Sequence, residues 1–229
     1  MRLRSPHRRG ELVPVSSESA CPQVATLMGM AAQSPHRDLP LFPLGTVLYP
    51  GGQLPLRIFE QRYLDMVREC ARKGTPFGVC LILSGTEAGV PATPAAVGTL
   101  AHIVDFHNRE DGLLGILAEG GARFRVARTR VRADGLVRGD VEVWPDEPAA
   151  SVPVELALLQ TILERLVENL APQWHHVPRD RYEDASWVGF RLAELLPLQD
   201  EERQHMLELS DPVRRLTELR DILPRFQRA

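Results

Sequence analysis

The chain has 229 residues, of which 44% are hydrophobic and 25% charged, so it is long enough for one large domain or two small ones with buried cores. Its formal net charge is −3; residues 38–150 carry 12 basic and 14 acidic side chains and residues 151–229 carry 10 and 14, which excludes a strongly basic nucleic-acid module. No run of about 18 apolar residues occurs, so the sequence predicts no membrane-spanning helix.

Residues 1–37 show no periodic apolar pattern. They are rich in Pro, Ser and Arg, with four arginines among the first nine residues. No apolar stretch of about 7–15 residues follows these arginines, which argues against a secretory signal. We interpret the segment either as a disordered tail or as an over-extended start, with translation beginning at Met28 or Met30.

Residues 38–145 have the pattern of a β-rich lobe with one helix. Short apolar runs at Leu39–Phe42 and Leu54–Ile58 contain prolines, which confines them to edges, bulges or strand starts. A helix is predicted next, because apolar side chains recur at helical spacing. These side chains are Phe59, Tyr63, Met66, Val67 and Cys70. Gly74 is expected to end this helix in the left-handed conformation.

Further strands are predicted after the helix. They are Phe77–Leu83, Val97–His107, Gly112–Glu119, Ala122–Arg132 and Leu136–Trp144. The last two form a hairpin around the Asp134-Gly135 turn signal. In this hairpin Phe124 and Val126 are apolar at even positions, whereas Ala127 and Val131 are apolar at odd ones. The inward face therefore switches near residue 127, which predicts a β-bulge or a sharp bend.

Residues 146–229 have the pattern of a helical lobe. Pro145–Pro153 is interpreted as a linker, and four helical stretches follow it. Apolar stripes mark three of them: Leu159, Ile162, Leu163, Leu166 and Leu170; Trp187, Val188, Leu192, Leu195 and Leu196; and Val213, Leu216, Leu219 and Leu223. Asp200 is expected to cap the remaining helix, and Asp211-Pro212 to open the last one. Strands followed by helices predict an α+β fold.

The sequence lacks the motifs of common catalytic sites. It contains neither the GxxxxGK[ST] loop of nucleotide triphosphate sites nor the GxSxG turn of nucleophile-elbow hydrolases. Lys73 is the single lysine, and it lies at the predicted end of a surface helix. A catalytic lysine needs a desolvated site, so a Ser–Lys dyad is not supported. We therefore predict that the protein is not an enzyme.

The cysteines and histidines predict no metal or cofactor site. Cys21, Cys70 and Cys80 form no CxxC pair, which argues against a disulfide framework and favours a reducing compartment, the cytoplasm. His102 and His107 are five apart on a strand, so they are expected on opposite faces, with His102 in the core. His175-His176 are interpreted as solvated loop residues. Three acids are interpreted as helix N-terminal charges: Asp180, Glu183 and Asp184.

Five arginines in the predicted hairpin offer an alternative function. Two are expected on one face and three on the other: Arg123 and Arg125, then Arg128, Arg130 and Arg132. Arginines on a β surface hold phosphates, and small β-barrels bind RNA. No exposed aromatic side chains alternate with these arginines, so a solvated sheet face is the simpler interpretation. RNA binding is kept as the alternative.

A distinctive run begins at Leu39. It reads LPLFPLGTVLYPGGQLPLRIFEQRYLDMV and is followed by FGVCLIL, VGTLAHIVDF, GARFRV and, in the helical lobe, SWVGFRLAELLPL. Together these segments resemble the N-terminal, substrate-binding domain of the Lon protease family. The resemblance implies a PUA-like β pseudo-barrel of about six strands with one helix, followed by a four-helix bundle.

The resemblance also implies a function in recognition. Members of the family use this domain to recognise unfolded or damaged polypeptides before an ATPase unfolds them. The 229 residues include neither an ATPase nor a protease segment, so we expect a non-catalytic, stand-alone module. It would act as an adaptor or holdase, without cofactor or membrane, and possible partners include a separate ATP-dependent protease.

Candidate contacts for such a client follow from the expected shape. Phe42, Leu44 and Tyr49 at the barrel rim are candidate polypeptide-binding residues, although the same side chains fit a barrel core. Side chains of the predicted 184–196 helix are the alternative contacts. Proline-rich edge runs leave backbone groups with which a guest strand could pair. A concave seam between the two lobes is the expected place for an apolar segment of the client.

Overall fold

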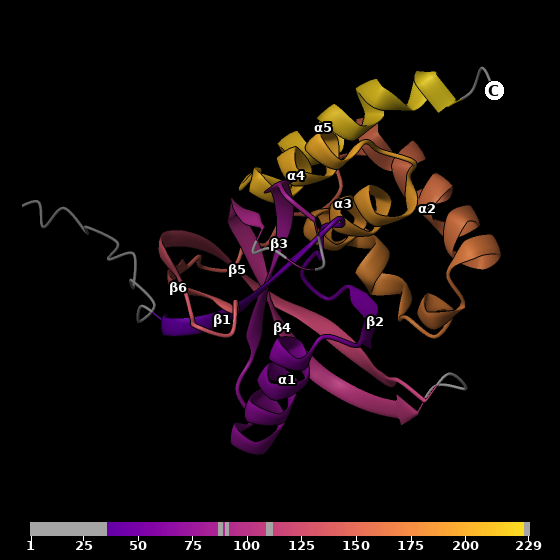
Figure 1. Ribbon diagram of the computed structural model, residues 1–229. Helices are drawn as coiled ribbons and strands as arrows, with labels where there is room; N and C mark the ends of the chain where they lie inside the picture. Colours follow the sequence, from indigo (N-terminus) through magenta and orange to yellow (C-terminus); the bar gives the residue numbers. More distant parts are fainter. Residues whose placement is uncertain (1–35, 87–88, 90–91, 109–111, 227–229) are drawn as a thin grey trace, which may run out of the picture. The chain divides into compact units, whose positions relative to one another are not determined.

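Six strands in the described part of the chain form one mixed sheet (Figure 1). The computed structural model describes residues 36–86, 89, 92–108 and 112–226, which all belong to one unit of the chain, Ala31–Ala229. The predicted tail lies outside the described residues up to residue 35. The strands are β1 (His36–Leu44), β2 (Gln53–Ile58), β3 (Phe77–Ser84), β4 (Thr93–Asn108), β5 (Leu114–Val131) and β6 (Val137–Val143).

The sheet closes on itself into a pseudo-barrel. Strand β1 pairs in parallel with β3 and antiparallel with β6, while β4 joins β3 to β5. Strand β5 pairs with β2 through its first half and with β6 through its second half, so the pairing of β6 with β5 closes the sheet and β2 stays at its edge. The predicted six-stranded pseudo-barrel is confirmed. The two strands predicted at Gly112–Glu119 and Ala122–Arg132 are wrong in one respect, because they form a single strand that changes partners.

The bulge predicted in β5 is confirmed. The register of β5 against β6 shifts between Val126 and Arg128, which leaves residue 127 as the extra one. Phe124 before the bulge is fully buried, but Ala127 and Val131 are exposed. The prediction that these two side chains turn inward is wrong, because the end of β5 beyond the bulge pairs with β6 alone.

Helix α1 (Gln61–Lys73) shares a buried hydrophobic cluster with side chains of β1–β5. Its buried face carries Tyr63, Met66 and Val67, and Gly74 ends the helix at φ 63° with its N–H bonded to the carbonyl of Cys70. Both features agree with the sequence pattern. Phe59 is 57% exposed, so its predicted place on the buried face is wrong: the helix begins after Glu60, and Phe59 precedes it.

Four α-helices follow the strands in the described residues. They are α2 (Ala157–Leu170), α3 (Ala185–Leu195), α4 (Asp200–Glu208) and α5 (Pro212–Ile222). Asp211 caps α5 by accepting hydrogen bonds from two backbone N–H groups, as predicted. Helix α4 is capped by Gln199 and not by Asp200. Within the described ranges, none of the helices has both the length and the apolar character that crossing a membrane requires.

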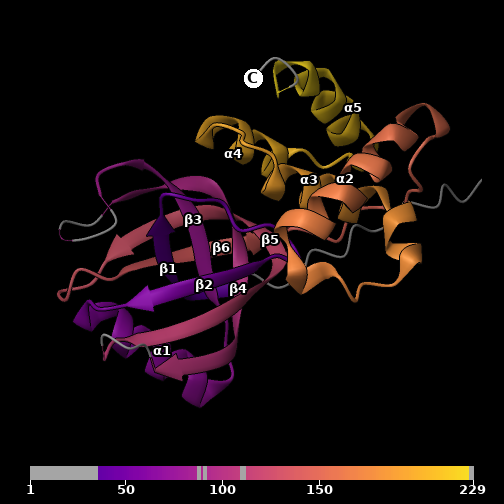
Figure 2. The same cartoon turned by 90° about the vertical axis from the view of Figure 1, so that its right-hand side faces the viewer.

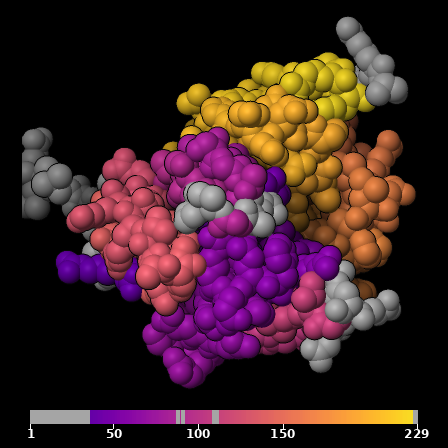
Figure 3. Space-filling view, viewed as in Figure 1, coloured from indigo at the N-terminus to yellow at the C-terminus, as the bar shows by residue number. Residues whose placement is uncertain are grey.

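One of the hydrophobic clusters of the described residues joins the strands to the helices. Side chains from the barrel, such as Tyr49, Leu81 and Val97, belong to the same buried cluster as the leucines of α2, α3 and α5. Figures 2 and 3 show the helical segment, coloured orange to yellow, directly against the strands. Leu170, predicted in this core, is 63% exposed at the end of α2. The division into lobes at 145 and 146 stays a prediction, because both parts lie in one unit.

Gly98 of β4 provides a test of the barrel packing. A Cβ atom at this position would lie 2.4 Å from the carbonyl oxygen of Val79 and 2.8 Å from the ring of Phe124. We expect Gly98→Ala to lower the free energy of unfolding by about 1–3 kcal/mol, because neither neighbour has room to move. Urea unfolding followed by circular dichroism measures this.

The exposed Thr129 on β5 supplies the matched control for Gly98→Ala. Thr129→Ala should change the free energy of unfolding by less than about 0.5 kcal/mol. Equal effects of the two substitutions would contradict the packing at Gly98.

Candidate functional site

A groove of about 860 Å³ lies between the pseudo-barrel and the helical segment. Four stretches of chain line it: Pro50-Gly51, Gly120–Arg123, residues within 145–151 and residues within 180–190. We call it the seam groove. It lies where the sequence analysis expects a concave seam between strands and helices.

The floor of the seam groove is the part of β5 where this strand changes partners. Pairing with β2 ends at Glu119, and pairing with β6 begins at Phe124. Between them, Gly120 exchanges backbone hydrogen bonds with Gly51 and Gly52 at 2.7 and 2.9 Å. A Cβ atom on Gly120 would lie 2.2 Å from the carbonyl oxygen of Tyr49, so only glycine fits this approach.

The opposite wall of the seam groove is the first turn of α3. Asp184 caps this helix by accepting hydrogen bonds from the N–H groups of Ser186 and Trp187. Trp187 is half-buried, with Tyr182 against its ring at 4.9 Å. The N–H of Ala185 donates to the carbonyl of Ala150 at 2.8 Å. The linker is therefore fastened to the helix, and an aromatic ring faces the groove.

Three charged side chains with little exposure join the strands to the helices beside the groove. Glu147 Oε1 pairs with Arg123 Nη2 at 2.7 Å, and Glu147 Oε2 accepts a hydrogen bond from Arg215 Nη1 at 2.9 Å. No side chain of the three is more than 6% exposed. Ser186 Oγ also donates to Glu147 Oε2, at 2.5 Å. One carboxylate thus contacts β5, α3 and α5. We call Arg123, Glu147 and Arg215 the interlobe clamp.

The arginines of the interlobe clamp also hold backbone carbonyls at the turn between α4 and α5. Arg123 Nη1 donates to the carbonyls of Leu207 and Leu209 at 2.7 and 2.6 Å. Arg215 Nε donates to the carbonyl of Met206 at 2.9 Å. These carbonyls belong to the last turn of α4 and the residue after it, where helical partners are lacking. The clamp therefore satisfies a buried helix end.

The ring of Phe190 supports both guanidinium groups. The Cζ atom of Arg215 lies 3.8 Å from the ring centroid, and that of Arg123 lies 5.6 Å from it. Burial lowers the pKa of Arg123, and the charge of Glu147 opposes this shift. An arginine keeps its charge in proteins, so the buried guanidinium groups depend on the carboxylate beside them.

A second polar contact joins α3 to the barrel loop at the other end of the floor. Arg191 is fully buried and donates from Nη2 to the carbonyl of Pro50 at 3.0 Å. It also pairs with Glu194 at 3.1 Å and lies 4.8 Å above the ring of Trp174. Burial raises the pKa of Glu194, and the nearby Arg191 opposes that rise. Helix α3 is thus fastened to the barrel at two points.

The three side chains predicted to contact a polypeptide are buried. Phe42 stacks on Tyr63 with 4.0 Å between ring centroids, and Leu44 lies in the same core. Tyr49 is 1% exposed and donates its hydroxyl to the carbonyl of Arg203 at 2.9 Å. Burial also raises the pKa of this hydroxyl. These placements favour the core interpretation that the sequence also allowed, and they leave the seam groove as the accessible site.

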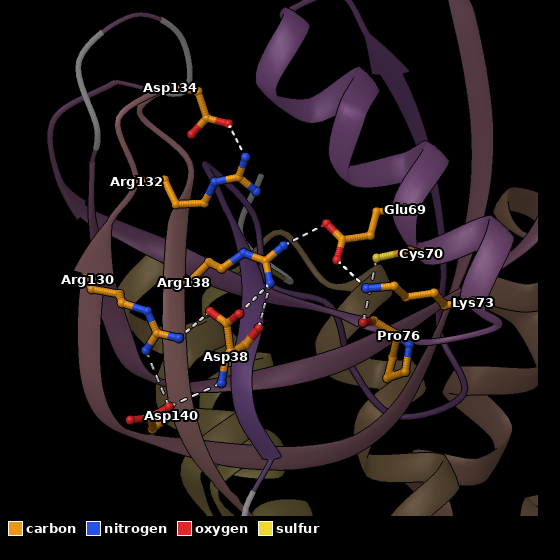
Figure 4. Close-up of polar contacts among 10 residues, drawn as sticks. All are labelled: Asp38, Glu69, Cys70, Lys73, Pro76, Arg130, Arg132, Asp134, Arg138 and Asp140. Carbon is orange, nitrogen blue, oxygen red and sulfur yellow. Dashed lines mark hydrogen bonds and ion pairs between the residues drawn. The ribbon is translucent and has the colours of Figure 1, made fainter.

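The predicted arginine strip is not one surface. Arg123 points into the interlobe clamp and is 5% exposed, because the helices cover this part of β5. Arg128 is exposed. Three other exposed members form ion pairs with nearby acids. Arg125 pairs with Glu142. Figure 4 shows the other pairs, Arg130 with Asp38 and Asp140, and Arg132 with Asp134. These acids reduce the positive potential that a phosphate backbone would need.

A polar network beside this strip ties β1 and α1 to β6 (Figure 4). Arg138, 7% exposed, donates to the Asp38 carboxylate at 2.9 Å and to Glu69 at 2.7 Å. Glu69 also pairs with Lys73 at 2.7 Å. Lys73 therefore has the solvated, helix-end role that the sequence predicts.

The two histidines of β4 lie on one face of the sheet. The register shifts at Val104, so His102 is opposite Glu119 and His107 is opposite Gly115. This corrects the expectation of opposite faces. The two positions on β5 are four residues, or roughly 13 Å, apart, too far for a shared metal ion. His102 is exposed, so its predicted place in the core is wrong. In the described ranges, no group of three His, Cys, Asp or Glu side chains could hold a metal ion.

The 184–196 helix, an alternative contact in the sequence prediction, supplies Trp187 and Phe190 to the groove, but the rest of the lining was missed. Asp184 caps α3 and Asp180 lies in the first turn of a 3₁₀ helix, as predicted, and both line the groove together with Glu183. Glu147 lies in the segment interpreted as a linker, where two prolines flank an Asp-Glu pair. That Asp-Glu pair is the one local sign that the segment carries functional or structural charges. Nothing in the sequence connects Glu147 to Arg215.

Comparison with known proteins bears on this site. Residues 38–225 match the family described as ATP-dependent protease La (LON) substrate-binding domain. The chain is 33% identical over 147 residues to protein cereblon from Danio rerio, which covers 61% of this chain and 32% of cereblon. It is 27% identical over 215 residues to the Lon protease of Anaeromyxobacter dehalogenans (strain 2CP-C), which covers 89% and 25%. The chain thus spans between a quarter and a third of these relatives.

A solved structure resembles the chain over a larger share of its own length. The crystal structure of a Lon N-terminal domain protein from Xanthomonas campestris aligns with a TM-score of 0.68 and 45% sequence identity. The alignment covers 81% of this chain and 98% of that one. Fold and sequence therefore agree in pointing to the same family.

The interlobe clamp predicts a large effect for a small change. Glu147→Gln removes the one carboxylate between two buried arginines, so we expect it to lower the free energy of unfolding by about 3–5 kcal/mol. Glu142→Gln breaks the exposed pair with Arg125 and should cost less than about 1 kcal/mol. Chemical unfolding of both variants tests this, and similar losses would contradict a buried clamp.

The network around Arg138 predicts a loss of stability in acid. The hydrogen bond from Lys73 first, and then the charge of Arg138, lower the pKa of Glu69. A carboxylate with a lowered folded-state pKa stabilises the fold above its unfolded pKa of about 4.3 and loses this contribution as the pH falls. We expect stability to decline below about pH 4.3 and Glu69→Gln to flatten part of the decline. Urea unfolding from about pH 3 to pH 7 measures both, and an unchanged profile would contradict the assignment.

Proposed function

The chain belongs to the family of ATP-dependent protease La (LON) substrate-binding domains, and from this membership we propose that it recognises unfolded or damaged polypeptide segments without catalysing a reaction. The observation that carries the proposal is the seam groove of about 860 Å³. Ligand sites favour concave places between packed units, with apolar walls and a few fixed polar groups. The seam groove has this character.

The lining of the groove suits an extended chain. Trp187 offers aromatic surface on one wall, with the buried Phe190 deeper, and the glycine-rich stretch Gly120–Ala122 keeps the opposite floor free of bulky side chains. An apolar client side chain would pack on the aromatic wall while its backbone follows the floor. Tyr49, one of the predicted contacts, would support the floor without touching the client, since its carbonyl lies against Gly120.

The interlobe clamp gives the groove a fixed shape before a client arrives. A preformed site binds more tightly, because less conformational entropy is lost on binding. We propose that the protein acts as an adaptor or holdase and delivers clients to a separate ATP-dependent protease in the cytoplasm. The free, buried thiols of Cys70 and Cys80 are compatible with that reducing compartment.

RNA binding stays the alternative, now with less support from the charges. It would use the exposed arginines of the strip, among them Arg128, which lies opposite Asp140 in the sheet register. The two functions differ in their response to salt. Phosphate contacts weaken steeply as salt rises, whereas apolar contacts do not.

Ala149 offers a way to block the groove without touching the core. It is exposed and lines the groove, so Ala149→Tyr should weaken the binding of a fluorescently labelled unfolded polypeptide by about tenfold or more through steric exclusion. Ala149→Ser, which adds little volume, should bind as the unmodified chain does. Fluorescence anisotropy at low and moderate salt measures the affinities.

A labelled RNA in the same assay tests the alternative function. Polypeptide binding that persists in salt and is lost in Ala149→Tyr supports the proposal. Equal affinity of both Ala149 variants for the polypeptide would contradict the site, and salt-sensitive RNA binding alone would contradict the function.

A further inference from the structure

The rim of the seam groove carries carboxylates that the protein does not neutralise. Asp146, Asp180 and Glu183 line the groove and are exposed. Within the described ranges, no lysine, arginine or histidine lies at ion-pair distance from any of them. The two arginines of the lining are already engaged, Arg123 with Glu147 at 2.7 Å and Arg181 with Asp184 at 3.7 Å.

Helix capping by a side chain accounts for one lining acid but not for these three. Asp184 caps α3 with its carboxylate. Asp180 lies in the first turn of the short 3₁₀ helix Arg179–Glu183 and Glu183 at its end, directly before Asp184, but neither forms a side-chain cap hydrogen bond. Asp146 lies in the linker, outside any helix. The charges of these three carboxylates therefore stay available at the rim.

The same groove presents aromatic surface a short way from the carboxylates. Trp187 lines the wall and is half-buried, with Tyr182 against its ring. Phe190 lies deeper, beneath the interlobe clamp. The cavity thus combines an apolar wall with an acidic rim, and this combination, not the acids alone, defines which ligand fits.

We propose that the seam groove selects polypeptide segments in which an aromatic or aliphatic side chain is flanked by arginine or lysine. The apolar side chain packs against Trp187, and the flanking cations pair with the rim carboxylates. The inference rests on the proposed polypeptide-binding function and adds the class of client. The same carboxylates repel acidic segments and phosphate backbones.

The expected size of the effect follows from ordinary surface ion pairs. One exposed pair changes an affinity by roughly 1.5- to 5-fold, so two or three pairs amount to about tenfold. Salt screens exposed charges, with a Debye length of about 8 Å at 0.15 M. The preference should therefore shrink as salt rises, while the apolar part of the binding stays.

Three labelled peptides with one apolar, aromatic centre test the preference. Their flanks carry arginine, glutamine or glutamate, and fluorescence anisotropy with the full chain measures each dissociation constant. We expect the arginine-flanked peptide to bind about tenfold more tightly than the glutamine-flanked one at low salt. The glutamate-flanked peptide should bind most weakly.

A charge-removal variant identifies the groups responsible. The variant Asp146→Asn/Asp180→Asn/Glu183→Gln should bind all three peptides with similar affinity. A control variant removes the same number of exposed carboxylates outside the groove: Glu155→Gln, Glu168→Gln and Glu201→Gln. The control should keep the order of affinities, and circular dichroism checks that both variants are folded.

The outcomes separate this inference from the function on which it rests. If the three peptides bind equally well, or if the control variant loses the preference as fully as the groove variant, the selection is overturned while polypeptide binding stands. If none of the peptides binds the full chain, both are overturned. If the arginine-flanked peptide is preferred and only the groove variant loses this preference, the inference is upheld.

Discussion

Glu147 lies between two buried arginines, and the relation of the helices to the barrel depends on that contact. Arg123 comes from β5 and Arg215 from α5, and each also donates to backbone carbonyls at the end of α4. Removing three charges from water is costly, and only close pairing with complete hydrogen bonding offsets that cost. The geometry tolerates few alternatives, so the clamp specifies one arrangement of linker, strand and helices.

Further contacts between strands and helices lie next to the interlobe clamp. Phe190 packs beneath both guanidinium groups, and Arg191, one residue later, reaches the carbonyl of Pro50 on the other side of the floor. The shared core then fills the space between the two polar contacts with apolar side chains. The seam groove lies along the edge of this packing. The two polar contacts and the apolar cluster hold its walls in place.

Local sequence signals predicted the helices and strands. They did not predict contacts between residues that are far apart in the sequence. The change of apolar parity around residue 127 located the bulge, and Asp211-Pro212 located a helix start. Glu147 and Arg215 are 68 residues apart, and no periodicity connects them. The register shift at Val104 likewise depends on which strand lies opposite. A single added residue moved His107 to the same face as His102.

The groove lies where a concave seam was predicted, but only part of its lining was predicted. The seam follows from the order of strands and helices, yet side chains expected at the barrel rim, such as Phe42 and Tyr49, are needed by the cores on either side. Large aromatic residues contribute most to stability when buried, which leaves the accessible surface to smaller and polar residues. The stretch Pro145–Pro153 illustrates this division, because it has the composition of a spacer. It nevertheless supplies both Glu147 to the clamp and Asp146 to the rim. Cohesion and the proposed recognition therefore involve adjacent residues, and the charge that holds the helices in place also fixes the position of the charge at the rim of the groove.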